Sequence, residues 1–320
     1  MIKIEANIKE AENHFELVKG FLQKRISTIL EIGHITKNKS IKKPQRKIQL
    51  SHNLRLYLND LLNESSLRNL ILSSPDNLLN TAVYLKVNNI SFITPKTDDN
   101  LILRNIFITH GYENRDFSKL EFIKRINIDT CPYCNRNYIY YLSKSSEIKP
   151  QIDHFFPKSI YPSFALSYYN LVPSCQTCNG FGAKEEKDPI TEGLVNPYLL
   201  SNDNFKFTYK IKSINFINPL ADKYSIEVLF KNKIPGHINV FKLDKLYSEH
   251  SDHVLELIIK SKISYSEKYK EYLSSYTGFD FNENEIDRMI LGNYSKENEL
   301  HKRPLTKLYQ DIGKELKLID

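Results

Sequence analysis

The four cysteines of this chain come as two C-x-x-C pairs, and this spacing constrains the fold more than any other feature. The pairs are Cys131-Pro-Tyr-Cys134 and Cys175-Gln-Thr-Cys178, in a sequence of 320 residues with no other cysteine. A C-x-x-C turn places two thiolates on the same side of a tight knuckle, and two knuckles complete a tetrahedron around zinc. A closed shell of four sulfurs leaves no open coordination position, so we predict a structural zinc. The alternatives are four unrelated buried thiols or two disulfides.

The segment between the knuckles carries Asp153-His154, and Asn179 directly follows the last cysteine. A zinc ion that clamps both ends of this segment brings Asp153 and Asn179 within reach of each other. Carboxylate and amide oxygens with several waters are the shell expected for Mg²⁺ or Mn²⁺, which predicts a second metal site. A neutral His154 beside it would take a proton from an attacking water while the metal stabilises charge on a phosphate. The pattern predicts metal-assisted phosphodiester hydrolysis. The alternative is a capped turn with a packed histidine.

The order and spacing of these motifs resemble the HNH endonucleases, which have the ββα-metal fold, in their zinc-knuckled form. The resemblance implies that His154 is the general base and that Asp153 and Asn179 are ligands of the catalytic metal. It also implies that Asn170, in an Asn-Leu pair, holds the loop that orients the base.

The sequence departs from that family at one position. A lysine usually stands three residues beyond the final His or Asn of the motif, whereas this chain has Gly182 there. Lys184 and Lys187 are the nearby candidates for the phosphate contact.

The wider layout resembles the HNH nuclease subunits of Septu-type anti-phage systems, including those attached to retrons. The features that carry this likeness are a helix-rich N-terminal part, the knuckle block, Asn196-Pro197-Tyr198 and a helical tail. This resemblance implies an ABC-like ATPase as partner and a role in defence.

Hydrophobic periodicity predicts a mostly helical α+β fold, and the resemblance implies that a ββα-metal unit with its structural zinc lies at the centre. We expect a helical N-terminal region at 1–124, the nuclease domain at 125–195, and a β-hairpin followed by helices at 196–320. Apolar stripes at 15–30 and 305–318 predict amphipathic terminal helices. These stripes either dock the partner or complete the chain's own core.

Alternation of apolar and polar residues predicts the strands. Within the nuclease unit we expect them at 138–142 and 149–155, followed by a helix that carries Asn179 and has Gly180 and Gly182 in its first turn. A small antiparallel sheet is expected from 205–211 and 224–228.

Charge and composition narrow the function class. The formal charge of +7 is moderate and favours local contact with phosphate. Residues 37–47 form a predicted basic loop, which either contacts nucleic acid or is a solvated surface loop. Thiolate ligands, the start of the chain and the lack of a long apolar run predict a cytoplasmic protein without a membrane partner. The resemblance to anti-phage subunits implies a bacterial one.

The leading prediction is a metal-dependent HNH endonuclease that cuts DNA. RNA such as tRNA is an alternative target, because a one-metal site recognises a phosphate and not the sugar beside it. The competing hypothesis is a non-catalytic zinc-knuckle module that binds nucleic acid or a protein, and such a module has no use for Asp153, His154 and Asn179. His250 and His253 lie near a carboxylate, but we interpret them as the polar surface of a helix.

Overall fold

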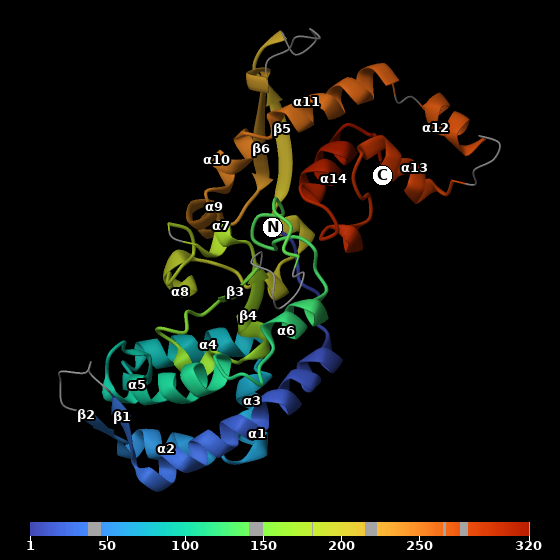
Figure 1. Ribbon diagram of the computed structural model, residues 1–320. Helices are drawn as coiled ribbons and strands as arrows, with labels where there is room; N and C mark the ends of the chain where they lie inside the picture. Colours follow the sequence, from blue (N-terminus) through green and yellow to red (C-terminus); the bar gives the residue numbers. More distant parts are fainter. Residues whose placement is uncertain are drawn as a thin grey trace.

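Figure 1 shows the fold as a computed structural model of the chain. The structure describes residues 1–37, 46–140, 150–180, 182–214, 223–264, 267–275 and 281–319. In this part of the chain helices dominate, and the strands pair as two-stranded antiparallel sheets. The predicted α+β class with mostly helical content is confirmed.

The N-terminal part is built on one long helix, α1 (Ile8–Ile32). Its apolar residues at three- and four-residue spacing, such as Phe15 and Leu22, are fully buried. The side chain of Asn7 caps its first turn, and Gly33 ends it at φ 74, a conformation that glycine adopts without strain. The other helices of this part are α2 (His52–Asp60), α3 (Glu64–Ile71), α4 (Pro75–Val87), α5 (Asp98–Arg104) and the π-helical segment η2 (Asn105–Tyr112).

A hairpin that the sequence analysis did not predict flanks the basic segment 37–47. Strand β1 (His34–Lys37) pairs with strand β2 (Arg46–Gln49), so that Lys37 lies opposite Arg46. Both ends of the predicted loop are therefore strand. Residues 38–45, the rest of that loop, lie outside the described residues.

The middle part carries the knuckles and the strands between them. Its elements are α6 (Lys119–Ile126), β3 (Gln151–His154), β4 (Leu171–Ser174), α7 (Gln176–Asn179) and α8 (Pro189–Glu192). Strand β3 falls within the predicted 149–155 and ends on Asp153-His154 as expected. Its partner is β4, with Asp153 opposite Val172 and His154 opposite Leu171. The chain therefore runs strand, strand, short helix from β3 to α7.

The prediction of a strand at 138–142 is wrong for the described residues 138–140. Tyr138 forms only an isolated bridge to Thr130, because the backbone here turns back on itself to close the first knuckle. Residues 141–149 lie outside the described residues. The placement of the glycines is also corrected, because Gly180 follows the last residue of α7 and does not lie in its first turn.

The C-terminal part begins with the predicted hairpin. Strand β5 (Lys206–Ile211) pairs with strand β6 (Ile226–Asn232), close to the expected 205–211 and 224–228. Helices follow: α9 (Pro235–Phe241), α10 (Leu243–Ser248), α11 (Ser251–Ile259) with the π-helical segment η9 (Lys260–Ser264), α12 (Glu267–Ser274), α13 (Glu283–Leu291) and α14 (Thr306–Glu315). Short 3-10 turns are η1 (Ser91–Ile93), η3 (Pro162–Phe164), η4 (Tyr168–Asn170), η5 (Pro197–Leu199), η6 (Asn202–Asn204), η8 (Lys223–Ser225) and η10 (Glu297–Glu299).

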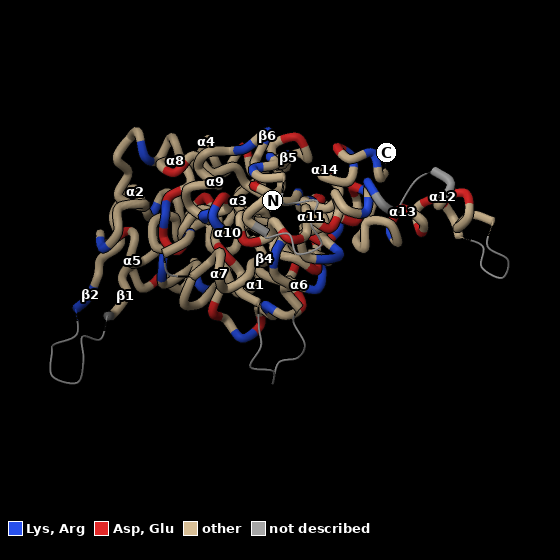
Figure 2. The backbone as a smooth tube through the Cα atoms, turned by 90° about the horizontal axis from the view of Figure 1, so that it is seen from above, with Lys and Arg blue, Asp and Glu red and all other residues tan. Residues whose placement is uncertain are grey.

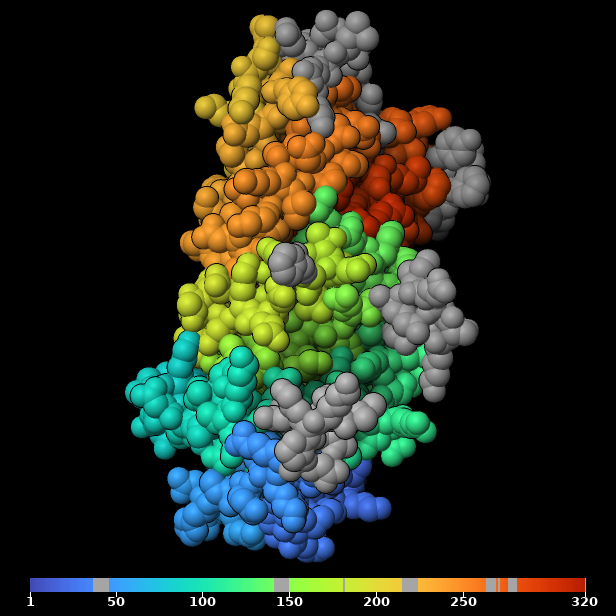
Figure 3. Space-filling view, turned by 60° about the vertical axis from the view of Figure 1, so that its left-hand side comes forward, coloured from blue at the N-terminus to red at the C-terminus, as the bar shows by residue number. Residues whose placement is uncertain are grey.

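The three parts stack along the long axis of the molecule, with the knuckle region in the middle (Figures 1 and 3). Buried residues of all three parts belong to one hydrophobic cluster. The stripes of both terminal helices are inside this cluster, including Val18 and Ile26 of α1 and Leu308 and Ile312 of α14. The stripes therefore complete the chain's own core, and docking of a partner by the flanking helical parts stays a prediction. The boundaries at 124 and 195 remain predictions.

Candidate metal centre and catalytic pocket

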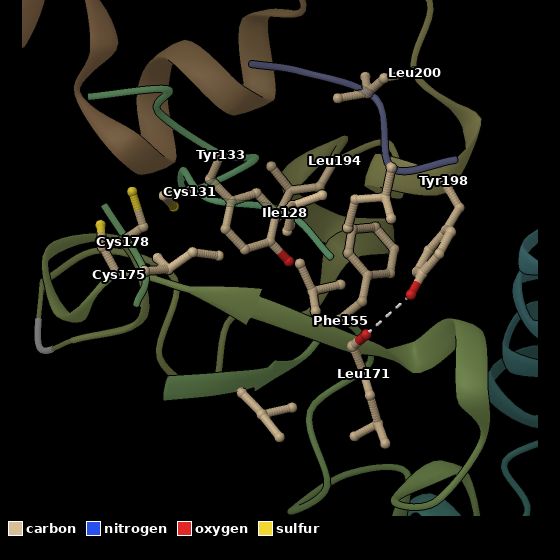
Figure 4. Packing of buried hydrophobic residues seen from close by; sticks show 14 of the residues in the cluster. Ile128, Cys131, Tyr133, Phe155, Leu171, Cys175, Cys178, Leu194, Tyr198 and Leu200 are labelled. Carbon is tan, nitrogen blue, oxygen red and sulfur yellow. Dashed lines mark hydrogen bonds between the residues drawn. The ribbon is translucent and has the colours of Figure 1, made fainter. Parts of the chain in front are cut away.

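The four cysteines lie together, as their spacing predicts. All four side chains are buried, and their sulfur atoms all lie within 4.8 Å of one another. Zinc–sulfur bonds of about 2.3 Å in a tetrahedron separate the sulfurs by about 3.8 Å, and the sulfurs of Cys134 and Cys175 are 3.9 Å apart. A disulfide needs about 2.05 Å, and the cysteines are free. The arrangement fits a metal such as zinc. Figure 4 shows Cys131, Cys175 and Cys178 gathered at one place.

Backbone and amide groups around the knuckles support thiolates. The Arg136 N–H donates to the sulfur of Cys134 at 3.4 Å, and Asn137 Nδ2 donates to the sulfur of Cys175 at 3.3 Å. Hydrogen bonds from the neighbouring thiols, Cys131 first, lower the pKa of Cys175, whereas burial raises the pKa of Cys131. Four thiolates in a buried cluster need a cation for charge balance, which zinc supplies.

Asp153 is buried, and each of its two carboxylate oxygens accepts a hydrogen bond from another side chain. Its Oδ2 accepts a hydrogen bond of 2.6 Å from the hydroxyl of Tyr133, which lies between the cysteines of the first knuckle. Burial, followed by the charge of Asp153, raises the pKa of Tyr133 well above its ordinary value, so this hydroxyl stays protonated and donates. The first knuckle therefore positions Asp153 directly. The role of Tyr133 was not predicted, although its place within C-P-Y-C is the signal that would have found it.

Lys184 lies inside the protein, not at its surface. Its side chain is fully buried, and its ammonium donates to Oδ1 of Asp153 at 3.3 Å and to the carbonyl oxygen of His154 at 3.0 Å. Its position differs from the solvent-facing one that a phosphate contact needs. The sequence does not reveal this burial, because the ion pair of Lys184 with Asp153 joins residues thirty-one apart and forms only in the folded chain. Lys187 is partly exposed, and its role stays a prediction.

His154 is oriented as a proton acceptor. Its Nε2 lies 3.1 Å from the carbonyl oxygen of Ala165. Since a carbonyl only accepts, Nε2 carries the proton and Nδ1 has a free lone pair. Burial, followed by the charge of Lys158, lowers the pKa of His154 well below its ordinary value, so the ring is neutral at pH 7. The ring of Tyr112 meets it edge-on with centroids 4.5 Å apart, which fixes its plane.

Asn170 fastens the loop between β3 and β4. Its Oδ1 accepts from the Phe156 N–H at 2.7 Å, and its Nδ2 donates to the carbonyl oxygens of Phe156 at 3.2 Å and Phe164 at 2.9 Å. The N-terminal helix α1 supports the same loop, because its His14 donates from Nε2 to the Leu166 carbonyl at 2.8 Å. This loop carries Ala165, so these bonds fix the acceptor that orients His154.

Asp153, His154 and Asn179 line one pocket of about 230 Å³. Asn179 donates from Nδ2 to Oε1 of Gln151 at 2.8 Å, which leaves its Oδ1 as the atom to bind a cation. Gly180 is needed here, because a Cβ at this position would lie 2.6 Å from the Gln176 carbonyl oxygen. Two hard oxygen donors on one pocket fit Mg²⁺ or Mn²⁺, although the ammonium of Lys184 competes for the same carboxylate.

Replacing Asn170 by alanine is expected to lower the free energy of unfolding by about 3 kcal/mol or more, because each buried group left without a partner costs about 1–3 kcal/mol. The measurement is denaturant unfolding of the zinc-loaded protein, with zinc content determined in parallel. Asn77→Ala, on an exposed position of α4, is the matched control and should change stability by less than about 0.5 kcal/mol. Equal effects of the two substitutions would contradict the role of Asn170.

A second group of possible ligands lies at the start of α11. His250, Asp252 and His253 place their ligand atoms within 4.8 Å of one another. However, Nε of Arg136 donates to Nε2 of His250 at 2.8 Å, and Nδ1 of His253 bonds the hydroxyl of Tyr309 at 2.7 Å. A guanidinium on one candidate ligand opposes cation binding, so the predicted reading of these histidines as a polar helix surface is the better one.

Among the described residues, none of the helices is both long and apolar enough to span a bilayer. Figure 2 shows basic and acidic residues intermixed along the chain, in agreement with its moderate charge.

Comparison with known proteins gives two partial similarities. The chain is 30% identical over 122 residues to the Septu protein PtuB of Bacillus thuringiensis, a match that covers 38% of this chain and 43% of that protein. It is 24% identical over 157 residues to protein ea31 of Escherichia phage lambda, which covers 47% of this chain and 50% of that protein. The chain thus matches about half the length of these relatives or less. No family model matches, and no solved structure matches. The comparisons therefore establish a distant similarity to a Septu protein over part of the chain.

Proposed function

We propose that this chain is a metal-dependent HNH endonuclease that hydrolyses phosphodiester bonds of DNA. The observation that carries the proposal is the state of His154. Its Nε2 donates to a fixed carbonyl, its Nδ1 keeps a free lone pair, and His154 lines one pocket together with Asp153 and Asn179. A purely structural histidine in a zinc knuckle has no need of this arrangement.

In the proposed reaction, Nδ1 of His154 accepts a proton from the attacking water, and Ala165 stabilises the resulting imidazolium through its carbonyl oxygen. Asp153 and Asn179 would hold Mg²⁺ or Mn²⁺, which supplies positive charge to the phosphate in the transition state. Tyr133 keeps Asp153 in place, and Asn170 keeps the loop of Ala165 in place. Zinc would serve as the structural clamp that fixes both knuckles relative to this pocket.

The proposed biological role is anti-phage defence together with an ABC-like ATPase. Support comes from the partial similarity to a protein named for a Septu system. Since the apolar stripes of both terminal helices are buried in the chain's own core, the partner would bind a surface other than these stripes.

Two alternative functions remain, and the cleavage assay described below distinguishes each of them from the proposed one. An RNA target is compatible with the site, because the groups named above recognise a phosphate and not a sugar. A non-catalytic zinc-knuckle module is the other alternative, and the shared pocket of Asp153, His154 and Asn179 counts against it.

The test is incubation of the purified full chain with plasmid DNA and with total RNA, in Mg²⁺ and in Mn²⁺. Each reaction is run with and without the co-expressed ATPase. We expect cutting of DNA that stops on chelation of the divalent metal. Cutting of RNA alone would favour the RNA-directed effector, and binding without cutting under every condition would favour the non-catalytic module.

A further inference from the structure

The residues just after His154 bring two more polar side chains to the catalytic pocket. Lys158 and Ser159 line it together with His154 and Asn179. They belong to the turn that begins at Pro157, three residues after the end of β3. The mechanism above leaves both of them without a role.

Lys158 has the position of an anion-binding group. Its ammonium lies 4.7 Å from the ring centroid of Tyr112, and the ammonium of Lys119 lies 4.4 Å from the same centroid. The same ring contacts the ring of His154. Both ammonium groups and the proposed base therefore lie against a single tyrosine ring. In the described part of the chain, neither lysine forms an ion pair within 4.0 Å, in contrast to Lys184. Two unpaired cations held beside a neutral base suit an incoming anion.

Ser159 adds a hydroxyl group that lacks a protein partner. Its Oγ is buried and has no hydrogen bond to any described residue. Burying such a group without a partner is unfavourable. Because this oxygen has almost no accessible surface, it meets a ligand in the pocket when its side chain rotates toward the pocket, and an oxygen atom of the ligand then becomes its partner. The unpaired hydroxyl and the lysines are independent observations that point to the same ligand chemistry.

Two carboxylates also face this pocket. Glu185 and Glu186 line it, and both side chains are exposed. They disfavour an anion that is bound by the lysines alone. A phosphate accompanied by a divalent cation tolerates them, because the cation offsets their charge.

We propose that Lys158 and Ser159 bind the phosphate group that is cut, with Lys119 as a second cation on the same nucleic-acid backbone. This inference rests on the proposed nuclease function and deepens it, because it assigns the substrate contact to residues other than Lys184 and Lys187. Lys158 acts here as a point charge and Ser159 as a neutral donor.

The test measures binding separately from cutting. The zinc-loaded full chain carrying His154→Ala is titrated into a short fluorescein-labelled DNA duplex, and anisotropy is recorded over a range of salt concentrations. Adding Lys158→Ala is expected to weaken binding about tenfold and to reduce the slope of log K against log salt by about 1, the change expected for one lost phosphate contact. Ser159→Ala should weaken binding with an unchanged slope. Lys158→Arg should retain the slope.

Lys245→Ala, on an exposed position of α10, is the matched control and should leave affinity near that of the His154→Ala background. Melting temperature and zinc content are measured for each variant, and Lys158→Gln replaces Lys158→Ala if the latter does not fold. The proposal is overturned if Lys158→Ala and Lys245→Ala behave alike, if only Lys187→Ala lowers the slope, or if the background protein does not bind the duplex. If Lys158 controls binding but the protein with His154 intact never cuts, the proposed function fails and the phosphate contact stands.

Discussion

Replacing Cys175 by serine is expected to release the zinc and unfold the centre of the molecule. Zinc contributes about 10–16 kcal/mol of binding free energy in structural sites, which is as large as the whole stability of a typical domain, about 5–15 kcal/mol. The knuckles also carry Tyr133, which holds Asp153. Losing one sulfur therefore removes both a large part of the folding free energy and the positioning of the pocket.

The measurement is zinc by elemental analysis together with thermal unfolding. Thr177→Ala is the matched control, since Thr177 lies in the same C-x-x-C turn with an exposed side chain. It should keep one zinc per chain and a nearly unchanged melting temperature. Absence of zinc from the unmodified protein, or unchanged melting of Cys175→Ser, would refute the structural zinc.

The second large effect is expected for His154→Ala, which should abolish cleavage while leaving zinc content and fold intact. General-base catalysis contributes about 10²–10⁴-fold to a rate, and His154 is the one histidine among the described residues that line this pocket. The measurement is the initial rate of plasmid cutting. His52→Ala, on an exposed position at the start of α2, is the control and should cut at the normal rate. A reduction of less than about tenfold would place the base elsewhere.

The same assay separates the base from the proposed metal ligands. Asn179→Ala should act through metal affinity, so added Mn²⁺ is expected to restore part of its activity, whereas His154→Ala should not respond. Asp153→Ala should also respond in part. Asn179→Ala is the cleaner variant, because removing Asp153 also leaves Tyr133 and the buried ammonium of Lys184 without their partner.

The local features of the protein could be predicted from the sequence. Two C-x-x-C turns predict the cysteine cluster because each turn fixes its own pair of thiols. The stripes of α1 and α14 predict amphipathic helices because helical periodicity is local, and alternation similarly predicts β5 and β6. Asp153-His154 at the end of a strand was predicted correctly for the same reason.

How these pieces meet could not be predicted from the sequence, because it depends on contacts between distant segments. The partner of β3 is β4, which lies beyond a loop held by the side-chain bonds of Asn170, and such bonds leave no periodic signal in the sequence. Burial of Lys184 against Asp153 depends on packing between distant segments, so a lysine that the sequence offered as a phosphate contact became an internal ion pair. Lys158, Lys119 and the ring of Tyr112 likewise meet only in the folded chain. Spacing along the chain fixes local geometry, whereas the charge and solvent exposure of a site depend on which distant segments cover it.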